Sequence, residues 1–355
     1  MKNRNALFVY GRPLAPLYSA LMRMREFMYR KGIFRVTSLE VPVISIGNLT
    51  LGGTGKTPVV QNLARMLRSR GWSPAVISRG YGGASREKIN IVSTGKKPLL
   101  DASYVGDEPR LLAETLEGIP VLTGAVRRHP ALKAVEMGSD VLILDDGFQH
   151  LALDRSVDLV LFNADTLAGN SRVFPSGDLR EPVKALHRCD GFIITGVNDS
   201  NMERADRFAG LLTTRFPLCP VFMAQYRPGA VIEDKDEGSP VEVKEEAIKN
   251  IAFFGFSGIA HPERFQQTMA DMGFTVNGFR MYADHYPYKQ KDMDRLTGFA
   301  EESGSQALIT TEKDLVKLHG IHKAMPLYAL RMDVVFDEVF HKFLIDKLAA
   351  YRAVE

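Results

Sequence analysis

A glycine-rich segment near the N-terminus carries the residue types that bind the phosphates of a nucleotide. It follows the apolar stretch Val43–Ile46 and consists of Thr50, Leu51, Gly52, Gly53, Thr54, Gly55, Lys56 and Thr57. Glycines let backbone N–H groups approach phosphate oxygens, the lysine reaches the β- and γ-phosphates, and the threonine hydroxyl ligates Mg²⁺. Thr50 stands where the usual pattern has glycine. The pattern still predicts that residues 50–57 bind a nucleoside triphosphate, and a chance glycine-rich loop is the alternative.

A pair of carboxylates supports this interpretation. Asp145 and Asp146 directly follow a second apolar stretch, Val141–Leu144. A buried strand that ends in aspartate places a carboxylate beside the Mg²⁺ of a bound nucleotide. Two solvated loop acids are the alternative. The chain has no Asn-Lys-x-Asp segment of the kind that reads guanine in GTPases, which favours ATP over GTP.

The elements that must position these residues alternate along the chain. Short apolar runs predict buried strands, and the segments between them predict helices. We expect an α/β fold with a P-loop NTPase core, a doubly wound, mostly parallel sheet, a second smaller α/β lobe and an N-terminal amphipathic helix. The predicted divisions are residues 1–36 (basic helix), 37–225 (kinase core), 226–249 (linker or hairpin) and 250–355 (C-terminal lobe).

The N-terminal 36 residues hold most of the basic excess of the chain. They contain eight Lys or Arg and one Glu, about +7, whereas the rest has 37 basic and 41 acidic residues, about −4. Apolar residues recur at helical spacing and form one stripe: Leu14, Leu17, Tyr18, Leu21, Met24 and Met28. Arg25 falls on the same stripe, where it would have to extend its charge away from the apolar face. The apolar stretch is too short to span a bilayer. The segment predicts a helix at an anionic membrane surface or, alternatively, one packed on the protein's own core.

The amino-acid composition limits the classes of protein to which this chain can belong. Of 355 residues, 45% are hydrophobic and 25% charged, which is typical of a globular protein with a sizeable core. The two cysteines, Cys189 and Cys219, lack metal-ligand spacing and indicate free thiols in a reducing compartment. No cleavable signal peptide is evident.

A series of short segments accompanies the nucleotide motifs along the chain: Ile46–Leu49, Ser78–Gly82, Gly106–Pro109, Asp145–His150, Leu179–Pro182, Gly258–Ala260, Asp284–His285 and Thr311–Asp314. In their number and order these segments resemble the tetraacyldisaccharide 4′-kinase (lipid A 4′-kinase) family over almost the whole chain. Two details differ from that family's pattern: His261 replaces an expected Asn, and Asp284-His285-Tyr286 replaces a double histidine.

The resemblance implies a reaction and roles for residues. ATP would phosphorylate the 4′-hydroxyl of a tetraacylated glucosamine disaccharide 1-phosphate, giving the 1,4′-bisphosphate of lipid A biosynthesis. Asp107 matches the base that accepts the hydroxyl proton, and His285 matches its partner, the pair being assembled from the two lobes. A helix N-cap and an ordinary loop histidine are the alternatives for these two.

Further positions are implied for the metal and the lipid. Thr57, Glu108, Asp145 and Asp146 would hold Mg²⁺, directly or through water. The sugar-phosphate head group would be bound by Arg79, Tyr81, Arg180 and Glu181, with Arg127 and Arg128 as weaker candidates and surface salt bridges as the alternative.

These implications favour a lipid kinase at the cytoplasmic face of the bacterial inner membrane, peripheral or anchored by its N-terminus. Its partners would be the lipid disaccharide and the anionic membrane, with no nucleic acid. Two other hypotheses remain at this point: a P-loop nucleotide switch or metal-insertion chaperone, and a soluble P-loop kinase for a small metabolite. The first leaves the arginines, Asp107 and His285 unexplained, and the second leaves the basic N-terminal helix unexplained.

Overall fold

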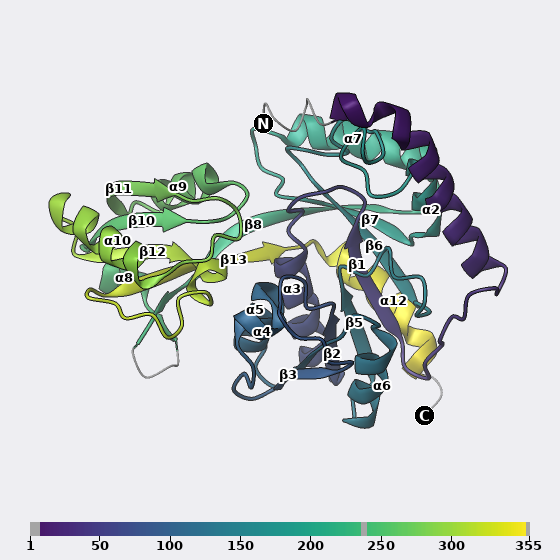
Figure 1. The fold of residues 1–355 in the computed structure, drawn as a ribbon, viewed down its shortest axis with the longest axis horizontal. Helices are drawn as coiled ribbons and strands as arrows, with labels where there is room; N and C mark the ends of the chain where they lie inside the picture. The colour runs from purple at the N-terminus through teal and green to yellow at the C-terminus, as the bar shows by residue number, and fades with distance from the viewer. Residues whose placement is uncertain (1–7, 236–239, 353–355) are drawn as a thin grey trace. The chain divides into compact units, whose positions relative to one another are not determined.

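The computed structural model describes residues 8–235 and 240–352, which form two compact units (Figure 1). Unit 1 contains residues up to Val105, Leu112–Tyr226 and Val334 onward, and unit 2 contains Gly106–Leu111 and Arg227–Asp333. Of the basic residues counted above, Lys2 and Arg4 lie outside the described residues, as does part of the predicted 226–249 linker.

Unit 1 is built on a mostly parallel sheet in the order β8-β7-β6-β1-β5-β2-β4-β3, in which only β3 is antiparallel to its neighbour. Its strands are β1 (Val43–Asn48), β2 (Pro74–Ser78), β3 (Asn90–Thr94), β4 (Pro120–Thr123), β5 (Val141–Asp145), β6 (Val157–Asn163), β7 (Gly191–Thr195) and the start of β8 (Val221–Glu233). Its helices are η1 (Arg12–Leu14), α2 (Ala15–Arg30), α3 (Lys56–Ser69), α4 (Ala102–Val105), the end of α5 (Asp107–Thr115), α6 (Arg128–Glu136), η2 (Val183–Arg188), α7 (Met202–Arg215) and α12 (Glu338–Arg352).

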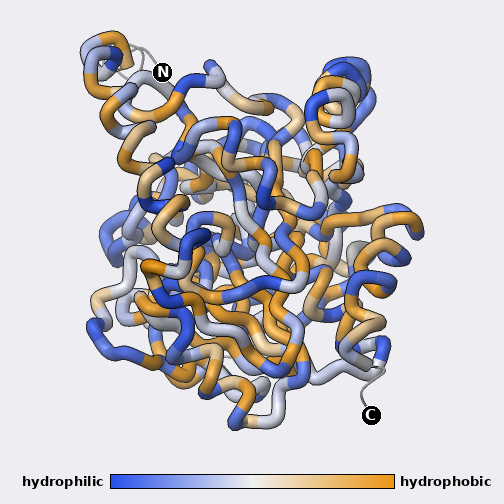
Figure 2. Tube along the Cα trace, turned by 90° about the vertical axis from the view of Figure 1, so that its right-hand side faces the viewer, coloured by the Kyte–Doolittle hydropathy of each residue, from blue (hydrophilic) through white to orange (hydrophobic). Residues whose placement is uncertain are grey.

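Alternation along the strands explains why helices cover both faces of this sheet. In β1, Ile44 and Ile46 pack into a core with α3 and α12, while Val43 packs into a different core with α6. Successive side chains of a strand point to opposite faces, so a strand that is apolar throughout must be covered twice. Figure 2 shows the hydrophobic stretches running through the interior and the hydrophilic ones mainly around the outside. The predicted doubly wound sheet is confirmed.

Unit 2 has a smaller sheet in the order β11-β10-β12-β13-β8, with β9 antiparallel to β8. Its elements are β9 (Val241–Val243), α8 (Glu245–Ile248), β10 (Ala252–Ser257), α9 (Pro262–Asp271), β11 (Thr275–Met281), α10 (Gln290–Glu302), β12 (Ala307–Thr311), α11 (Glu312–Leu315) and β13 (Leu327–Val335). Phe254 packs with α10 and Phe253 with α9, so this sheet is also covered on both faces.

The chain passes from unit 1 to unit 2 between Tyr226 and Arg227, one residue from the predicted boundary. Residues 226–249 contain the predicted hairpin rather than a linker, because β8 continues to Glu233 and pairs antiparallel with β9. The last helix, α12, does not belong to the C-terminal lobe predicted for residues 250–355. Phe340, Leu344 and Leu348 are fully buried in the core of unit 1 that α3 also lines, and Figure 1 shows α12, in yellow, beside β1.

Candidate functional site

The glycine-rich loop lies in unit 1, after the carboxyl end of the central strand β1 and before α3. In a doubly wound sheet this edge is where ligands bind. Gly55 occupies the N-cap of α3 with φ 73°, a left-handed conformation that glycine adopts without strain. Backbone N–H groups at this helix start are donors for phosphate oxygens. The loop predicted from residues 50–57 thus has the strand–loop–helix context that phosphate binding requires.

The loop is supported from behind by two other strands. The Thr195 hydroxyl, at the end of β7, donates to the Thr54 carbonyl at 2.8 Å. A Cβ placed on Gly55 would lie 1.5 Å from the Tyr226 hydroxyl, which is contributed by β8. Burial raises the pKa of Tyr226 to about 12, so this hydroxyl keeps its proton. Gly55 is therefore required by both its backbone angle and its neighbour.

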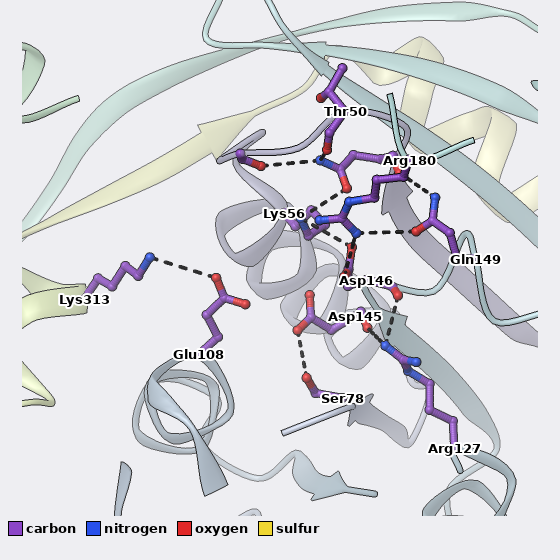
Figure 3. A network of polar contacts seen from close by, with 12 residues as sticks. Thr50, Lys56, Ser78, Glu108, Arg127, Asp145, Asp146, Gln149, Arg180 and Lys313 are labelled. Carbon is purple, nitrogen blue, oxygen red and sulfur yellow. Dashed lines mark hydrogen bonds and ion pairs between the residues drawn. The ribbon is translucent and has the colours of Figure 1, made fainter. Parts of the chain in front are cut away.

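The side chain of Lys56 is held at the base of the loop by polar partners that a nucleotide could replace. Its Nζ lies 3.4 Å from Asp146 Oδ1 and donates to Asn48 Oδ1 at 3.4 Å. Arg180 Nη1 donates to both carboxylate oxygens of Asp146 at 2.9 Å (Figure 3). We call Asn48, Lys56, Asp146, Gln149 and Arg180 the phosphate-loop cluster.

The positive charges of neighbouring side chains determine the protonation state of Asp146. Burial alone would raise its pKa, but the attraction of Lys56 and Arg180 outweighs burial and holds the pKa below its ordinary value. The residue also has φ 51°, which is uncommon outside glycine. Asp146 is therefore an ionised, sharply positioned carboxylate at neutral pH.

Asp145 and Asp146 play different parts. Asp145 is 1% exposed, and its Oδ2 accepts a hydrogen bond from Ser78 Oγ at 3.0 Å. The buried Arg127 donates to the carbonyl of Asp145 at 3.1 Å and to that of Asp146 at 2.9 Å. Burial lowers the pKa of Arg127. Arg127, a weak head-group candidate from the sequence, thus fixes the backbone of the aspartate turn.

The predicted head-group residues separate into two kinds. Arg79 and Tyr81 are exposed at the loop after β2, and Tyr81 is 79% exposed. Glu181 is instead 4% exposed and accepts from Arg188 Nη2 at 2.7 Å, and Arg188 also pairs with Glu26 of α2 at 3.2 Å. The structure therefore presents Glu181 as a buried partner of Arg188 rather than as a surface contact.

Helix α2 is attached to the same region. The Tyr18 hydroxyl donates to the Arg180 carbonyl at 3.0 Å, and Arg25 Nη2 donates to the Gln149 carbonyl at 2.9 Å. The sequence predicted that Arg25 would extend its charge away from the apolar face, whereas its side chain contacts the loop after β5 in the same unit. Leu17 and Leu21 of that stripe stay exposed.

Unit 2 contains the second group of predicted residues. His285 Nδ1 lies 3.2 Å from Asp107 Oδ2, and Lys313 Nζ lies 3.2 Å from His285 Nε2. Lys313 is also 3.6 Å from Asp284 and 4.0 Å from Glu108 (Figure 3 shows the pair with Glu108). We call these five residues the Asp107 cluster. Asp107 is the first residue of α5 rather than the cap before it, and it comes together with His285 from distant parts of the sequence.

Few carboxylates in the structure are placed to ligate Mg²⁺. Within residues 8–235 and 240–352, no group of three or more His, Cys, Asp or Glu side chains is arranged to hold a metal ion. Mg²⁺ in nucleotide sites uses one or two carboxylates, with phosphate oxygens and water completing the octahedron. The half-buried Thr57 and Asp146 and the buried Asp145 offer oxygen donors of this type.

Several residues of the site are missed by motif reasoning. Asn48 and Gln149 lie within matched segments, yet their roles depend on contacts between segments: Gln149 Nε2 donates to the Asn48 carbonyl at 2.9 Å. Tyr226 and Thr195 have no local signal, because only the folded sheet brings them behind the loop. Lys313 lies within a matched segment that carried no role.

Comparison with known proteins gives a consistent result. A sequence model of the family described as tetraacyldisaccharide-1-P 4′-kinase matches residues 7–349. The chain is 43% identical over 352 residues to the tetraacyldisaccharide 4′-kinase of Desulfotalea psychrophila, covering 99% of both chains. It is 38% identical to the enzyme of that name from Syntrophus aciditrophicus, covering 94% of this chain and 90% of the relative.

A solved structure is similar over the same range. The crystal structure of LpxK from Aquifex aeolicus in complex with ATP matches with a TM-score of 0.77 and 30% identity, covering 97% of this chain and 99% of that chain. None of the helices in the described part of this chain has the length and hydrophobicity needed to cross a membrane.

Proposed function

Because this chain belongs to the tetraacyldisaccharide-1-P 4′-kinase family, we propose that it transfers the γ-phosphate of ATP to the 4′-hydroxyl of a tetraacylated glucosamine disaccharide 1-phosphate. The product is the 1,4′-bisphosphate. The observation that carries the proposal is the phosphate-loop cluster, in which Lys56 stands at the start of α3 with Asp146 as its counter-ion.

The phosphate loop binds and orients ATP. Phosphoryl transfer depends mainly on positioning and on stabilising the charge of the transferred group. When ATP arrives, its phosphates compete with Asp146 for Lys56. Arg180 and Lys56 then supply positive charge beside the phosphates, while the Thr195 and Tyr226 contacts keep the loop in shape.

Mg²⁺ fits the donors that are present. Thr57, Asp145 and Asp146, with Glu108 as a further ligand, would hold it, directly or through water. When bound, Mg²⁺ neutralises phosphate charge and orients the terminal phosphoryl group. Arg127 keeps the aspartate turn in place for that purpose through its two backbone contacts.

Asp107 acts as the base toward the sugar hydroxyl. A carboxylate within hydrogen-bond reach accepts the proton as the oxygen attacks phosphorus. His285 orients that carboxylate through the 3.2 Å contact. Arg79, Tyr81 and Arg180 recognise the anionic head group, because a guanidinium binds phosphate in a bidentate manner. Glu181 follows Arg180 in the chain and is held in place by Arg188.

We place the reaction at the cytoplasmic face of the inner membrane, with the N-terminal helix as a peripheral anchor. ATP is soluble, whereas the acyl chains of the substrate stay in the bilayer. Helices η1 and α2 expose apolar side chains on a segment rich in basic residues, a combination typical of interfacial helices: Leu14, Leu17, Leu21, Met24 and Phe27.

The test is direct phosphorylation of the lipid. Purified full-length protein is incubated with ATP, Mg²⁺ and the disaccharide 1-phosphate in detergent micelles, and the lipid is analysed by mass spectrometry for one added phosphate. Lys56→Met should lose ATP affinity and product together. Asp107→Asn should bind ATP normally and lower kcat by about 10²-fold or more, because it removes the base.

Lys291→Met serves as the matched control, since Lys291 is an exposed lysine of α10. It should behave as the wild type does. Nucleotide hydrolysis without a phosphorylated lipid would contradict the kinase and favour a nucleotide switch. Wild-type turnover by Asp107→Asn would contradict the assigned base alone.

A further inference from the structure

Lys313 lies in α11, directly after β12, in the segment Thr311–Asp314, whose role the reaction above leaves open. Its ammonium group is the cation of the Asp107 cluster. It lies 3.2 Å from His285 Nε2, 3.6 Å from an oxygen of Asp284 and 4.0 Å from an oxygen of Glu108. Its side chain is 24% exposed, so it is more restricted than a surface lysine.

The contact with the imidazole determines where the ring proton resides. A lysine ammonium group has three donors and no acceptor, so His285 Nε2 must accept with its lone pair. A neutral imidazole then carries its only proton on Nδ1. Nδ1 is the atom that lies 3.2 Å from Asp107 Oδ2, so the proton is directed at the carboxylate.

The backbone around both residues is held by a shared anchor. Asp314 is fully buried, and its Oδ2 accepts from the Gly258 backbone N–H at 2.9 Å and from the Thr311 hydroxyl at 2.8 Å. The Gly258 carbonyl in turn accepts from the His285 N–H at 3.1 Å. One buried carboxylate thus ties the lysine segment to the histidine loop.

His285 itself has a strained backbone. Its φ is 58°, in the left-handed region that non-glycine residues rarely adopt. Such strain persists when surrounding contacts over-determine the conformation, and it concentrates at functional sites. Here the strained residue directs one ring nitrogen at Asp107 and the other at Lys313.

We propose that Lys313 is a positioning residue that holds His285 as the neutral Nδ1–H tautomer and thereby directs the base Asp107. The proposal rests on the reaction assigned above and extends it from an Asp–His pair to a Lys–His–Asp series. Without Lys313, the proton can move to Nε2, where Asp284 Oδ1 is 3.9 Å away. Nδ1 would then present a lone pair to Asp107, and the two groups would repel each other.

A plainer role for Lys313 is neutralisation of Asp284 and Glu108. The two roles differ in what Lys313→Met does to the imidazole. Charge neutralisation alone leaves the ring tautomer unchanged, whereas the positioning role requires the tautomer to change. Arginine also has only donors, so Lys313→Arg should preserve the tautomer.

The tautomer can be read without substrate by nitrogen NMR of the full-length protein labelled with ¹⁵N-histidine. His285→Gln identifies the signal among the eight histidines. We expect the wild type and Lys313→Arg to carry the proton on Nδ1, and Lys313→Met to lose that form. A wild-type ring protonated on Nε2, or an Nδ1–H ring that persists in Lys313→Met, would overturn the proposal. If Lys313→Met does not fold, Lys313→Ala takes its place, and an Nδ1–H ring that persists there overturns the proposal in the same way.

Steady-state kinetics of the Lys313 variants test the proposal independently of the NMR measurement. Lys313→Met should lower kcat by roughly 10-fold to 100-fold with little change in the KM for ATP, and Lys313→Arg should recover much of the loss. Added to Asp107→Asn, Lys313→Met should have little further effect, because both act through the same carboxylate. Full additivity in the double variant would refute the coupling. If the wild type phosphorylates no lipid, the reaction assignment fails, while the tautomer measurement still stands or falls by itself.

Discussion

His150 illustrates how much a single side chain near the phosphate loop is shaped by its surroundings. Burial and the nearby guanidinium groups of Arg127, Arg155, Arg25 and Arg79 lower its pKa to about 3. Its Nε2 has no hydrogen-bond partner among the residues that the structure describes. The imidazole is therefore neutral throughout the physiological range and adds no charge to an already cationic region.

This shift predicts a pH-dependent stability. Between about pH 6.5 and pH 3 the unfolded chain binds a proton at His150 that the native protein does not. The free energy of unfolding should therefore fall as the pH is lowered, with this residue contributing up to about 1.4 kcal/mol per pH unit. His150→Gln cannot titrate and should show a shallower decline in urea denaturation measured from about pH 7 to about pH 4.5.

The comparison of variant with wild type isolates His150. Asp158, whose pKa burial raises to about 6, titrates in the same range with the opposite sign, but it is present in both proteins. The difference between the two unfolding curves should widen steadily as the pH falls. Curves that stay parallel would show that His150 titrates normally in the native state.

At the residue scale, motif reasoning was most successful where function is encoded locally. The spacing of Gly55, Lys56 and Thr57 predicts a loop whose strand-to-helix context the structure contains. Tyr226 and Arg127 could not be assigned in this way, because each acts on backbone supplied by a distant strand. Glu181 could not be recognised as buried, since its partner Arg188 becomes apparent only in the folded chain.

At the element scale, the junction between β1 and α3 has little tolerance at Gly55. Alanine there would be strained at φ 73° and would place its Cβ against the Tyr226 hydroxyl. We expect Gly55→Ala to fold but to weaken ATP binding at least about 10-fold, equivalent to about 1.4 kcal/mol, because the loop must move away from β8. Calorimetric titration with ATP measures the change.

Gly138→Ala is the matched control for that experiment. Gly138 also has positive φ, 94°, but a Cβ added there meets nothing within 4 Å. It should lower stability slightly and leave ATP affinity unchanged. Equal ATP affinity in Gly55→Ala and Gly138→Ala would show that the contact with Tyr226 has no part in shaping the loop.

Elements with unbroken apolar runs could be predicted from the sequence, whereas those defined by distant pairing could not. Strands β5, β6 and β7 are buried on both faces and therefore read as continuous hydrophobic segments. The middle of β8 contains Pro228 and Gly229 and is partly exposed, so its sequence left a linker and a hairpin equally open, and only the pairing with β9 decides for the hairpin. Strand β3 is a short edge strand that only its partner β4 defines.

At the scale of the whole molecule, some side chains of the N-terminal helix α2 attach it to the protein, and others are exposed to solvent. Tyr18, Arg25 and Glu26 contact other parts of unit 1, while the leucines at positions 14, 17 and 21 are exposed to solvent. Replacing Leu17 and Leu21 with glutamate should weaken binding to anionic vesicles by at least about 10-fold, since apolar insertion is lost and each acid opposes the lipid charge by about 1 kcal/mol. Vesicle co-sedimentation measures the change, and ATP affinity should be unaffected.

Leu211 and Leu218 provide the matched control. They are 67% and 93% exposed, yet they lie outside the N-terminal segment. The double variant Leu211→Glu/Leu218→Glu should bind vesicles as the wild type does. Equal losses in both double variants, or no dependence on anionic lipid, would argue against docking through α2.

The return of α12 to unit 1 has a consequence for how the protein is made. The ribosome synthesises β1 and α3 early, but Phe340, Leu344 and Leu348, which complete the core around them, follow only after residues 227–333 of unit 2. Domains ordinarily fold in order of synthesis. Here the nucleotide-binding unit cannot complete its core until the residues of unit 2 and then those of α12 have been synthesised.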